Sequence, residues 1–248
     1  MALHFTKYHA NGNDFILIDH RDSSWSPTRA EIARLCHRRY GIGADGLILL
    51  TRVEGYDFGM RNYNSDGGEC TMCGNGGRAL LRFAADLGIS DGESRFLAID
   101  GEHSGKIVGE TVSIRMQSVT TISETPAGFV LDTGSPHLVI PVSGLIDYDV
   151  VGEGRRIRNS SQFMPNGINV NFYEKKENRI FLRTYERGVE DETLSCGTGA
   201  IATAIVTDSN LVHCVGGELR VEYRKITPDR IDDIWLSGKV EKTFQGVL

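Results

Sequence analysis

Two stretches of sequence decide the fold, Met72-Cys73-Gly74-Asn75-Gly76 and Ser195-Cys196-Gly197-Thr198-Gly199. Each is a turn that joins a cysteine to two glycines and a polar residue, and each precedes an apolar run that favours a helix. The pattern predicts a thiol at the N-terminus of each helix, where unpaired backbone N–H groups and the helix dipole favour an anion. Because helix N-termini lower cysteine pKa values, we expect both thiols to be available for chemistry.

Other motifs repeat at nearly the offset that separates the two cysteine turns. Arg61-Asn62-Tyr63-Asn64 precedes the first turn, as Arg183-Thr184-Tyr185-Glu186 precedes the second. Likewise, Gly12-Asn13-Asp14-Phe15-Ile16-Leu17 is matched by Gly134-Ser135-Pro136-His137-Leu138-Val139. A series of pairs in the same order indicates an internal duplication.

Composition sets the class of protein. The chain has 248 residues, enough for two domains of ordinary size, with 40% hydrophobic and 24% charged residues. A net charge of −6 argues against a nucleic-acid partner. No apolar run approaches membrane-spanning length and the N-terminus lacks a signal-peptide pattern, so we expect a cytoplasmic protein that does not enter a membrane.

The cysteines favour thiol chemistry over metal binding. An odd count without a signal peptide indicates free thiols at Cys36, Cys70, Cys73, Cys196 and Cys214. Cys70-Thr71-Met72-Cys73 is a CxxC, but no second CxxC or histidine pair completes a zinc site, so we expect no metal. A redox pair is a weaker alternative, because the Gly-Asn-Gly after Cys73 builds a turn that a redox pair does not need.

The remaining pattern predicts strands around the two apolar helices. A further helix is expected at 29–38 after Ser26-Pro27-Thr28, and the domain boundary near Ser118 to Thr125. Strands are expected at 5–9, 15–19, 47–50, 58–63, 96–99, 104–108, 111–117, 129–132, 137–142, 166–172, 179–185, 219–224 and 234–237. The fold class is therefore α/β (α+β): two pseudo-symmetric domains, each a curved, mainly antiparallel sheet around a central apolar helix, with both cysteines facing the crevice between the halves.

Two thiols presented by matching halves suit stereochemical inversion at carbon. One thiolate would remove a proton from one face of the substrate, and the opposite thiol would return a proton to the other face. The α-proton of an amino acid is a very weak acid, so the carbanion needs stabilisation. Two helix N-termini directed at the α-carboxylate would supply it, without pyridoxal phosphate or another cofactor.

At these residues the chain resembles the diaminopimelate epimerase family, cofactor-independent two-cysteine enzymes of lysine and peptidoglycan precursor synthesis. The matching motifs run in order along nearly the whole chain: Gly12 to Phe15, Gly41 to Gly46, Asn64 to Gly67, Met72 to Arg78, Pro136-His137, Asn169 to Phe172, Glu186 to Gly188 and Glu192 to Ala200. The resemblance implies a homodimer of two-domain subunits that closes on a small amino acid. It places one domain at 1–118, with 238–248 returning to it, and the other at 119–237.

The resemblance also implies roles for individual residues. Cys73 and Cys196 would be the acid/base pair, with His137 and Glu186 close enough to tune proton transfer. Backbone donors around the reacting carboxylate would come from Gly74, Asn75, Gly197 and Thr198. The distal amino acid head would be held by Asn13, Asn64, Asn169 and Arg187.

Two departures from the family pattern leave room for a different substrate. Ser135, also expected to bind substrate, stands where many members carry Asn, and Gly46 stands where some carry Gln. Racemisation of another amino acid on the same scaffold is therefore an alternative to diaminopimelate epimerisation. A non-catalytic or redox protein that uses Cys70 and Cys73 is a further alternative, but it leaves Cys196 and the duplication unexplained.

Overall fold

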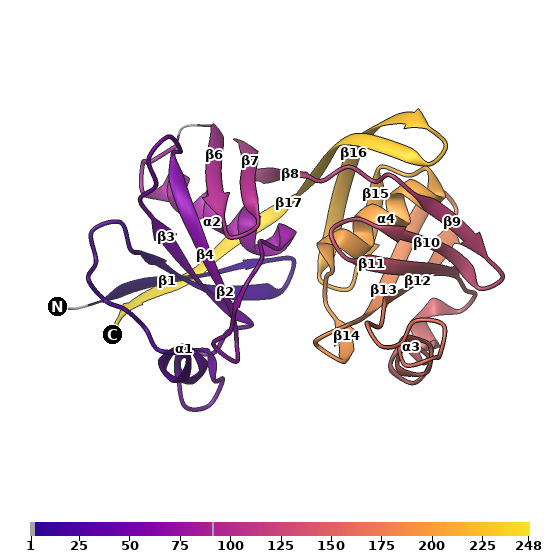
Figure 1. Cartoon of the computed structure of the whole chain (residues 1–248), viewed down its shortest axis with the longest axis horizontal. Coiled ribbons are helices and arrows are strands. Elements are labelled where there is room, and N and C mark those ends of the chain that lie inside the picture. The colour runs from indigo at the N-terminus through magenta and orange to yellow at the C-terminus, as the bar shows by residue number, and fades with distance from the viewer. Residues whose placement is uncertain (1–2, 91) are drawn as a thin grey trace. The chain divides into compact units, whose positions relative to one another are not determined.

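The structure is a computed structural model that describes residues 3–90 and 92–248. The chain divides into two compact units, Met1–Ile114 with Gly238–Leu248, and Arg115–Ser237 (Figure 1).

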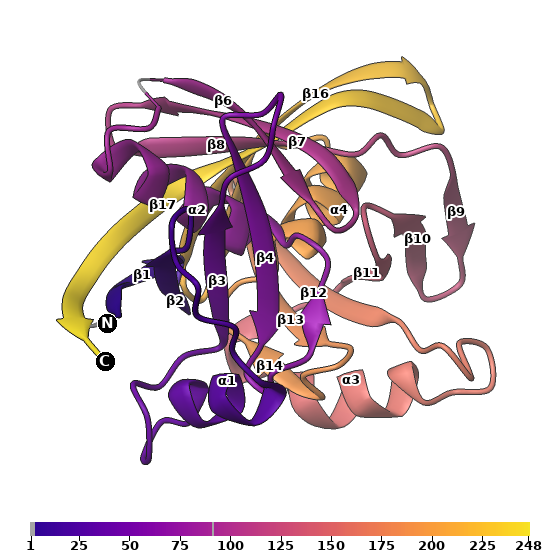
Figure 2. The same ribbon diagram turned by 60° about the vertical axis from the view of Figure 1, so that its left-hand side comes forward.

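The first unit is a sheet with helices α1 and α2. Helix α1 begins after Thr28, whose side chain accepts the N–H of Glu31 while the Glu31 carboxylate accepts the N–H of Thr28. Figure 2 shows α1 near one end of the neighbouring strands β3 and β4. The elements are β1 His4–Ala10, β2 Asn13–Asp19, α1 Arg29–Cys36, β3 Gly46–Thr51, β4 Phe58–Asn64, β5 Glu69–Cys70, α2 Gly74–Asp86, β6 Glu93–Ala98, β7 Gly101–Val108 and β8 Thr111–Met116.

The second unit is a sheet with helices α3 and α4 and a short 3-10 turn, η1. Its last strand, β17, crosses from this unit into the first, where it pairs with β1 from His4 opposite Val247 to Ala10 opposite Val240. The elements are β9 Ile122–Thr125, β10 Gly128–Asp132, β11 Pro136–Pro141, η1 Leu145–Asp147, α3 Val150–Arg158, β12 Asn169–Lys176, β13 Arg179–Glu186, β14 Asp191–Thr193, α4 Gly197–Thr207, β15 Leu211–Cys214, β16 Gly217–Thr227 and β17 Arg230–Val247.

The two units have the same strand pairing. In the first, β1–β2 and β3–β4 are antiparallel, whereas β2–β3 and β4–β6 are parallel. In the second, β10–β11 and β12–β13 are antiparallel, whereas β11–β12 and β13–β15 are parallel. Helices α1 and α3 occupy equivalent connections, as do α2 and α4. The predicted fold class, two similar domains of mainly antiparallel sheet around an apolar helix, is confirmed.

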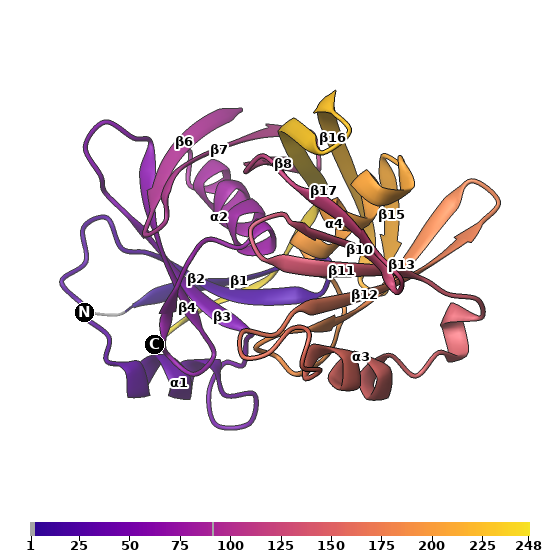
Figure 3. The ribbon, with the colours of Figure 1, turned by 45° about the vertical axis from the view of Figure 1, so that its right-hand side comes forward.

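Helices α2 and α4 form the centres of their units. Every residue from Gly74 to Leu81 is buried, and so is nearly every residue from Gly197 to Ile205. Helix α2 packs on β1, β2, β3 and β7, and Figure 3 shows it next to these strands. Helix α4 packs on β10 to β13, β15 and β16. Because strands cover the sides of each helix, its first turn is the part that a ligand can reach.

The sequence prediction was wrong about several elements. Strand β17 has 18 residues, where the pattern predicted a strand at 234–237 and the resemblance implied that 238–248 returns to the first domain; the end of β17 pairs with β1 through the backbone while most of its side chains are exposed. Helix α3 was missed because Gly152 and Gly154 are poor helix formers. The short strands β9 and β15 were also missed. The expected helix at 29–38 ends at Cys36.

Gly154 explains why α3 tolerates a poor helix former. A Cβ at this position would lie 2.3 Å from Cβ of Tyr185, which is fully buried on β13. Only glycine lets the helix approach the sheet this closely.

We therefore expect Gly154→Ala to lower the free energy of unfolding by about 1–3 kcal/mol, because overpacking outweighs the gain in helix propensity. Urea denaturation measures the change. Gly92→Ala is the control, since a Cβ there meets nothing within 4 Å, and it should change the stability by less than about 0.5 kcal/mol. A stabilised Gly154→Ala variant would contradict the packing argument.

Candidate active site

Cys73 caps the N-terminus of α2 and exposes its thiol. Its backbone is extended, and its Sγ accepts a hydrogen bond from the N–H of Gly76 at 3.2 Å. An N–H donor at the positive end of a helix stabilises negative charge on sulfur. The geometry suits a thiol that takes up and releases a proton.

A buried polar network supports the first turn of α2. Arg78 is fully buried and donates to Oδ1 of Asn11 through both terminal nitrogens, each at 3.1 Å, and to Oδ1 of Asn75 at 2.6 Å. Nδ2 of Asn75 then donates to Oδ1 of Asn13 at 3.2 Å. The network therefore joins two predicted substrate-binding residues, Asn13 and Asn75, and fixes their orientation.

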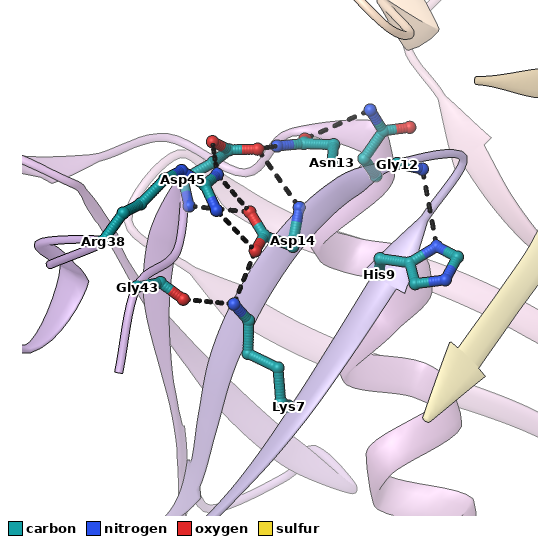
Figure 4. Close-up of polar contacts among 9 residues, drawn as sticks. Lys7, His9, Gly12, Asn13, Asp14, Arg38, Gly43 and Asp45 are labelled. Atoms are coloured by element: carbon teal, nitrogen blue, oxygen red, sulfur yellow. Dashed lines mark hydrogen bonds and ion pairs between the residues drawn. The ribbon is translucent and has the colours of Figure 1, made fainter. Parts of the chain in front are cut away.

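Charged residues hold the other side of Asn13 (Figure 4). Nδ2 of Asn13 donates to Oδ2 of Asp45 at 2.8 Å, and Arg38 bridges the carboxylates of Asp45 and Asp14. The buried ammonium of Lys7 bonds Asp14 and the carbonyl of Gly43. Burial opposes charge on Asp14, but the hydrogen bonds from Arg38 and Lys7 lower its pKa to about 2. One amide hydrogen of Asn13 remains without an acceptor among the described residues.

The other predicted residues of this unit are less firmly held. Asn64 is exposed at the end of β4, where its Oδ1 accepts the thiol hydrogen of Cys70 at 3.4 Å. Burial raises the pKa of Cys70 to about 12. Gly46 lies where a Cβ would be 2.7 Å from the carbonyl oxygen of Tyr63. The backbone thus leaves no room for a side chain at this position.

Cys196 caps α4, but its thiol is buried, unlike that of Cys73. Burial raises its pKa well above the ordinary range, and the charge of Glu186 raises it further. The Thr198 hydroxyl, 3.5 Å from Sγ, and the nearby Gly199 N–H lower it only in part. The expectation of a lowered pKa at both helix N-termini is therefore wrong for Cys196, because desolvation outweighs the helix end.

Glu186 and Arg187 end β13 with different partners. Oε2 of Glu186 accepts the Thr193 hydroxyl at 3.0 Å. The Arg187 guanidinium donates to the backbone carbonyl of Asn166 at 3.1 Å, and no carboxylate among the described residues pairs with it. Arg187 is thus a half-buried cation with donor capacity for an anion.

Three further predicted residues meet beside Arg187. Oδ1 of Asn169 accepts the N–H of Arg187 at 2.8 Å, and its Nδ2 donates to Oγ of Ser135 at 2.9 Å. His137 lies 3.1 Å from Ser135 through Nε2. Burial, followed by the charge of Arg187, lowers the pKa of His137 to about 3, so its ring is neutral. The loop that carries Ser135 also contacts α4, since Thr133 donates to the carbonyl of Thr198 at 2.9 Å.

The predicted residues therefore gather in two groups, one in each unit. In the first unit, Asn13 and Asn75 meet beside the helix end that carries Cys73 and Gly74. In the second, Ser135, His137, Asn169 and Arg187 are linked. Glu186, Gly197 and Thr198 accompany Cys196.

Sequence reasoning missed the residues that support these groups, notably Arg78, Asp45 and Asn171. A signal was present, because polar residues two apart on a strand share one face. Ser135 and His137 have this spacing, and so do Asn169 and Asn171. Parallel pairing places His137 opposite Asn169.

Among the residues that the structure describes, no three His, Cys, Asp or Glu side chains gather as a metal site. Within the same part of the chain, no helix is long and apolar enough to cross a membrane. What the two groups offer chemically is a thiol at each helix end, surrounded by hydrogen-bond donors.

Sequence comparison finds close similarity to one family. The family model described as diaminopimelate epimerase matches residues 5–121 and 129–231. A diaminopimelate epimerase of Flavobacterium psychrophilum is 44% identical over 96% of this chain and 97% of its own length. A diaminopimelate epimerase of Chlorobaculum tepidum is 39% identical over 96% of this chain and 98% of its own length.

Structure comparison extends the likeness of fold. A phenazine biosynthesis protein of the PhzF family from Bacillus anthracis superposes with a TM-score of 0.78, covering 100% of this chain and 99% of that one. Its sequence is only 14% identical, so the likeness concerns the fold alone.

The unequal exposure of the two helix-capping thiols gives a prediction about alkylation. We expect iodoacetamide to modify Cys73 at least tenfold faster, as a rough estimate, than Cys196, because Cys196 is buried and burial raises its pKa. Peptide mass mapping over time measures both rates. Cys73→Ser should remove the fast phase, and equal rates at the two cysteines would contradict the asymmetry.

Proposed function

The chain belongs to the diaminopimelate epimerase family, and we propose that it interconverts LL- and meso-diaminopimelate by proton transfer between thiols and the α-carbon. The observation that carries the proposal is the pair of cysteines that cap the buried helices α2 and α4. Such an isomerase acts in the synthesis of lysine and of peptidoglycan precursors.

The proposed mechanism assigns different starting states to the two thiols. Cys196 would begin as a protonated thiol, because burial and the charge of Glu186 both raise its pKa. Cys73 is exposed and receives an N–H bond from Gly76, which favours a thiolate base. From this state, Cys73 would remove the α-proton and Cys196 would give a proton to the opposite face. The reverse reaction would exchange these roles.

The carbanion would be stabilised by fixed donors. The backbone N–H groups that begin α2 and α4, at Gly74, Asn75, Gly197 and Thr198, would bind the reacting carboxylate. These donors are held in place by buried helices, so they need little reorganisation as charge develops. No step in this mechanism needs a cofactor.

The resemblance also supports proposals beyond the chemistry. We propose that the protein forms a homodimer and acts in the cytoplasm on a small amino acid, without nucleic acid or membrane partners. Light scattering of the purified protein would test the dimer. A second candidate function, racemisation of another amino acid, is favoured by Ser135 and Gly46, which depart from the family pattern.

The two-thiol mechanism predicts that neither cysteine can be removed. Cys73→Ala and Cys196→Ala should each abolish epimerisation, because inversion needs an acid and a base on opposite faces. The assay is exchange of the α-proton of LL-diaminopimelate in D₂O, with conversion to the meso form and no added cofactor. Cys36→Ala, in the core of the first unit, is the control and should retain turnover. Near-normal epimerisation by either single variant would overturn the mechanism.

The guanidinium of Arg187, which has no carboxylate partner among the described residues, predicts how the second head of the substrate is held. A guanidinium binds a carboxylate through two parallel hydrogen bonds, which lysine cannot reproduce. Arg187→Met and Arg187→Lys should therefore lower kcat/KM for diaminopimelate by roughly two orders of magnitude. They should change any residual activity on alanine much less.

Arg220→Met, at an exposed position on β16, is the matched control and should behave as wild type. If Arg187→Met keeps full turnover of diaminopimelate, the distal clamp is elsewhere. If wild type turns over alanine as well as diaminopimelate, the second candidate function gains support.

A further inference from the structure

A chain of hydrogen bonds leads from the backbone of β11 to Ser135. Asn171 is fully buried on β12, and its Nδ2 donates to the carbonyl of Leu138 at 3.1 Å and contacts Nδ1 of His137 at 3.0 Å. Its Oδ1 accepts the hydroxyl of Thr184 at 3.0 Å. A Cβ at Gly199 would lie 2.3 Å from this same oxygen, so the amide also lies against the first turn of α4.

These contacts fix the orientation of the Asn171 amide. The carbonyl of Leu138 can only accept, so the atom that faces it must be the nitrogen. The second amide hydrogen then points at Nδ1 of His137, which must accept it. Because the buried ring is neutral, its hydrogen is on Nε2.

The hydrogen on Nε2 decides what the Ser135 hydroxyl can do. Nε2–H donates to Oγ of Ser135, which also accepts from Nδ2 of Asn169. Asn169 is fixed in the same way, since its Nδ2 donates to the carbonyl of Pro136 and its Oδ1 accepts the N–H of Arg187. A hydroxyl oxygen has two lone pairs and one hydrogen. Both lone pairs of Ser135 are used, so its hydrogen remains as a donor.

We infer that Asn171 and His137 are positioning residues that hold Ser135 as a hydrogen-bond donor to the carboxylate bound by Arg187. The inference rests on the proposed function, which supplies a substrate with a distal carboxylate. Ser135 is half-buried and Asn169 links it to the backbone of Arg187. The Ser135 hydroxyl and the Arg187 guanidinium, on residues that Asn169 links, would both donate to a carboxylate.

In this arrangement His137 acts through Ser135. A residue that acts only on binding should change KM and leave kcat nearly unaltered. A residue that acts on the thiols should change kcat. These two behaviours can be separated by kinetics.

The first test uses the protein without substrate. ¹⁵N spectra of the histidine-labelled protein should show His137 with a hydrogen on Nε2 and a bare Nδ1, and His137→Gln identifies the signal by its loss. Asn171→Leu removes the donor to Nδ1 and should give a mixture of the two tautomers. A hydrogen on Nδ1 in the wild type would overturn the relay, whatever the activity of the protein.

The second test is a double-mutant cycle on diaminopimelate kinetics. Ser135→Ala and His137→Met should each raise KM roughly tenfold to a hundredfold, with kcat nearly unchanged, because each removes or misdirects one hydrogen bond to a charged group. In the Ser135→Ala background, His137→Met should raise KM by less than about a further twofold, since the histidine acts through the serine. His137→Gln keeps an amide donor near the Nε2 position and should retain most of the affinity.

Ser209→Ala is the matched control, at the end of α4 and outside the relay, and should behave as wild type. If His137→Met lowers kcat equally with and without Ser135, the positioning role is wrong. If the wild type does not exchange the α-proton of diaminopimelate, the proposed function fails, and the tautomer of His137 still decides the relay.

Discussion

The structure depends on one constraint, which is that a helix enclosed by strands can offer only its end to a ligand. Helices α2 and α4 are buried along nearly their whole length. Their first-turn N–H groups lack partners within the helix, so these groups can donate to an anion. A cysteine as N-cap then places a sulfur at the position where the helix most favours negative charge. The scaffold thus makes an acid/base group and an anion site from the same few residues.

The two helix ends are similar in sequence and different in environment. Cys73 is exposed and accepts an N–H bond, whereas Cys196 is buried beside Glu186 and Thr198. A duplicated element has therefore diverged in desolvation and kept its geometry. This divergence suits a reaction in which one thiol must begin protonated and the other must begin as a base.

The sequence predicts most of the fold because its signals are local. The Cys-Gly turns followed by apolar runs predict α2 and α4, and short apolar runs between turn residues predict most strands. Helix α3 escapes prediction because Gly154 has a poor helix propensity. Glycine is needed there because Tyr185, some thirty residues further along the chain, packs against the helix. The raised pKa of Cys196 also cannot be predicted from local sequence, because the burial that causes it depends on tertiary packing. Motif resemblance suggests which residues bind, but the partners that orient them, Arg78 and Asn171, are known only once the strands are paired.

The two polar networks follow one design, although they share no residues. In the first unit, the carbonyl oxygen of Asn13 accepts from Asn75 within the protein. In the second, the acceptor atoms of Asn169 and Ser135 are used by Arg187 N–H and by His137. Among the described residues, these two networks leave an Asn13 amide hydrogen, the Ser135 hydroxyl and the Arg187 guanidinium as donors for a ligand, beside the helix N–H groups. Surfaces lined by donors in a partly desolvated setting bind carboxylates. A substrate that carries carboxylates matches this polarity.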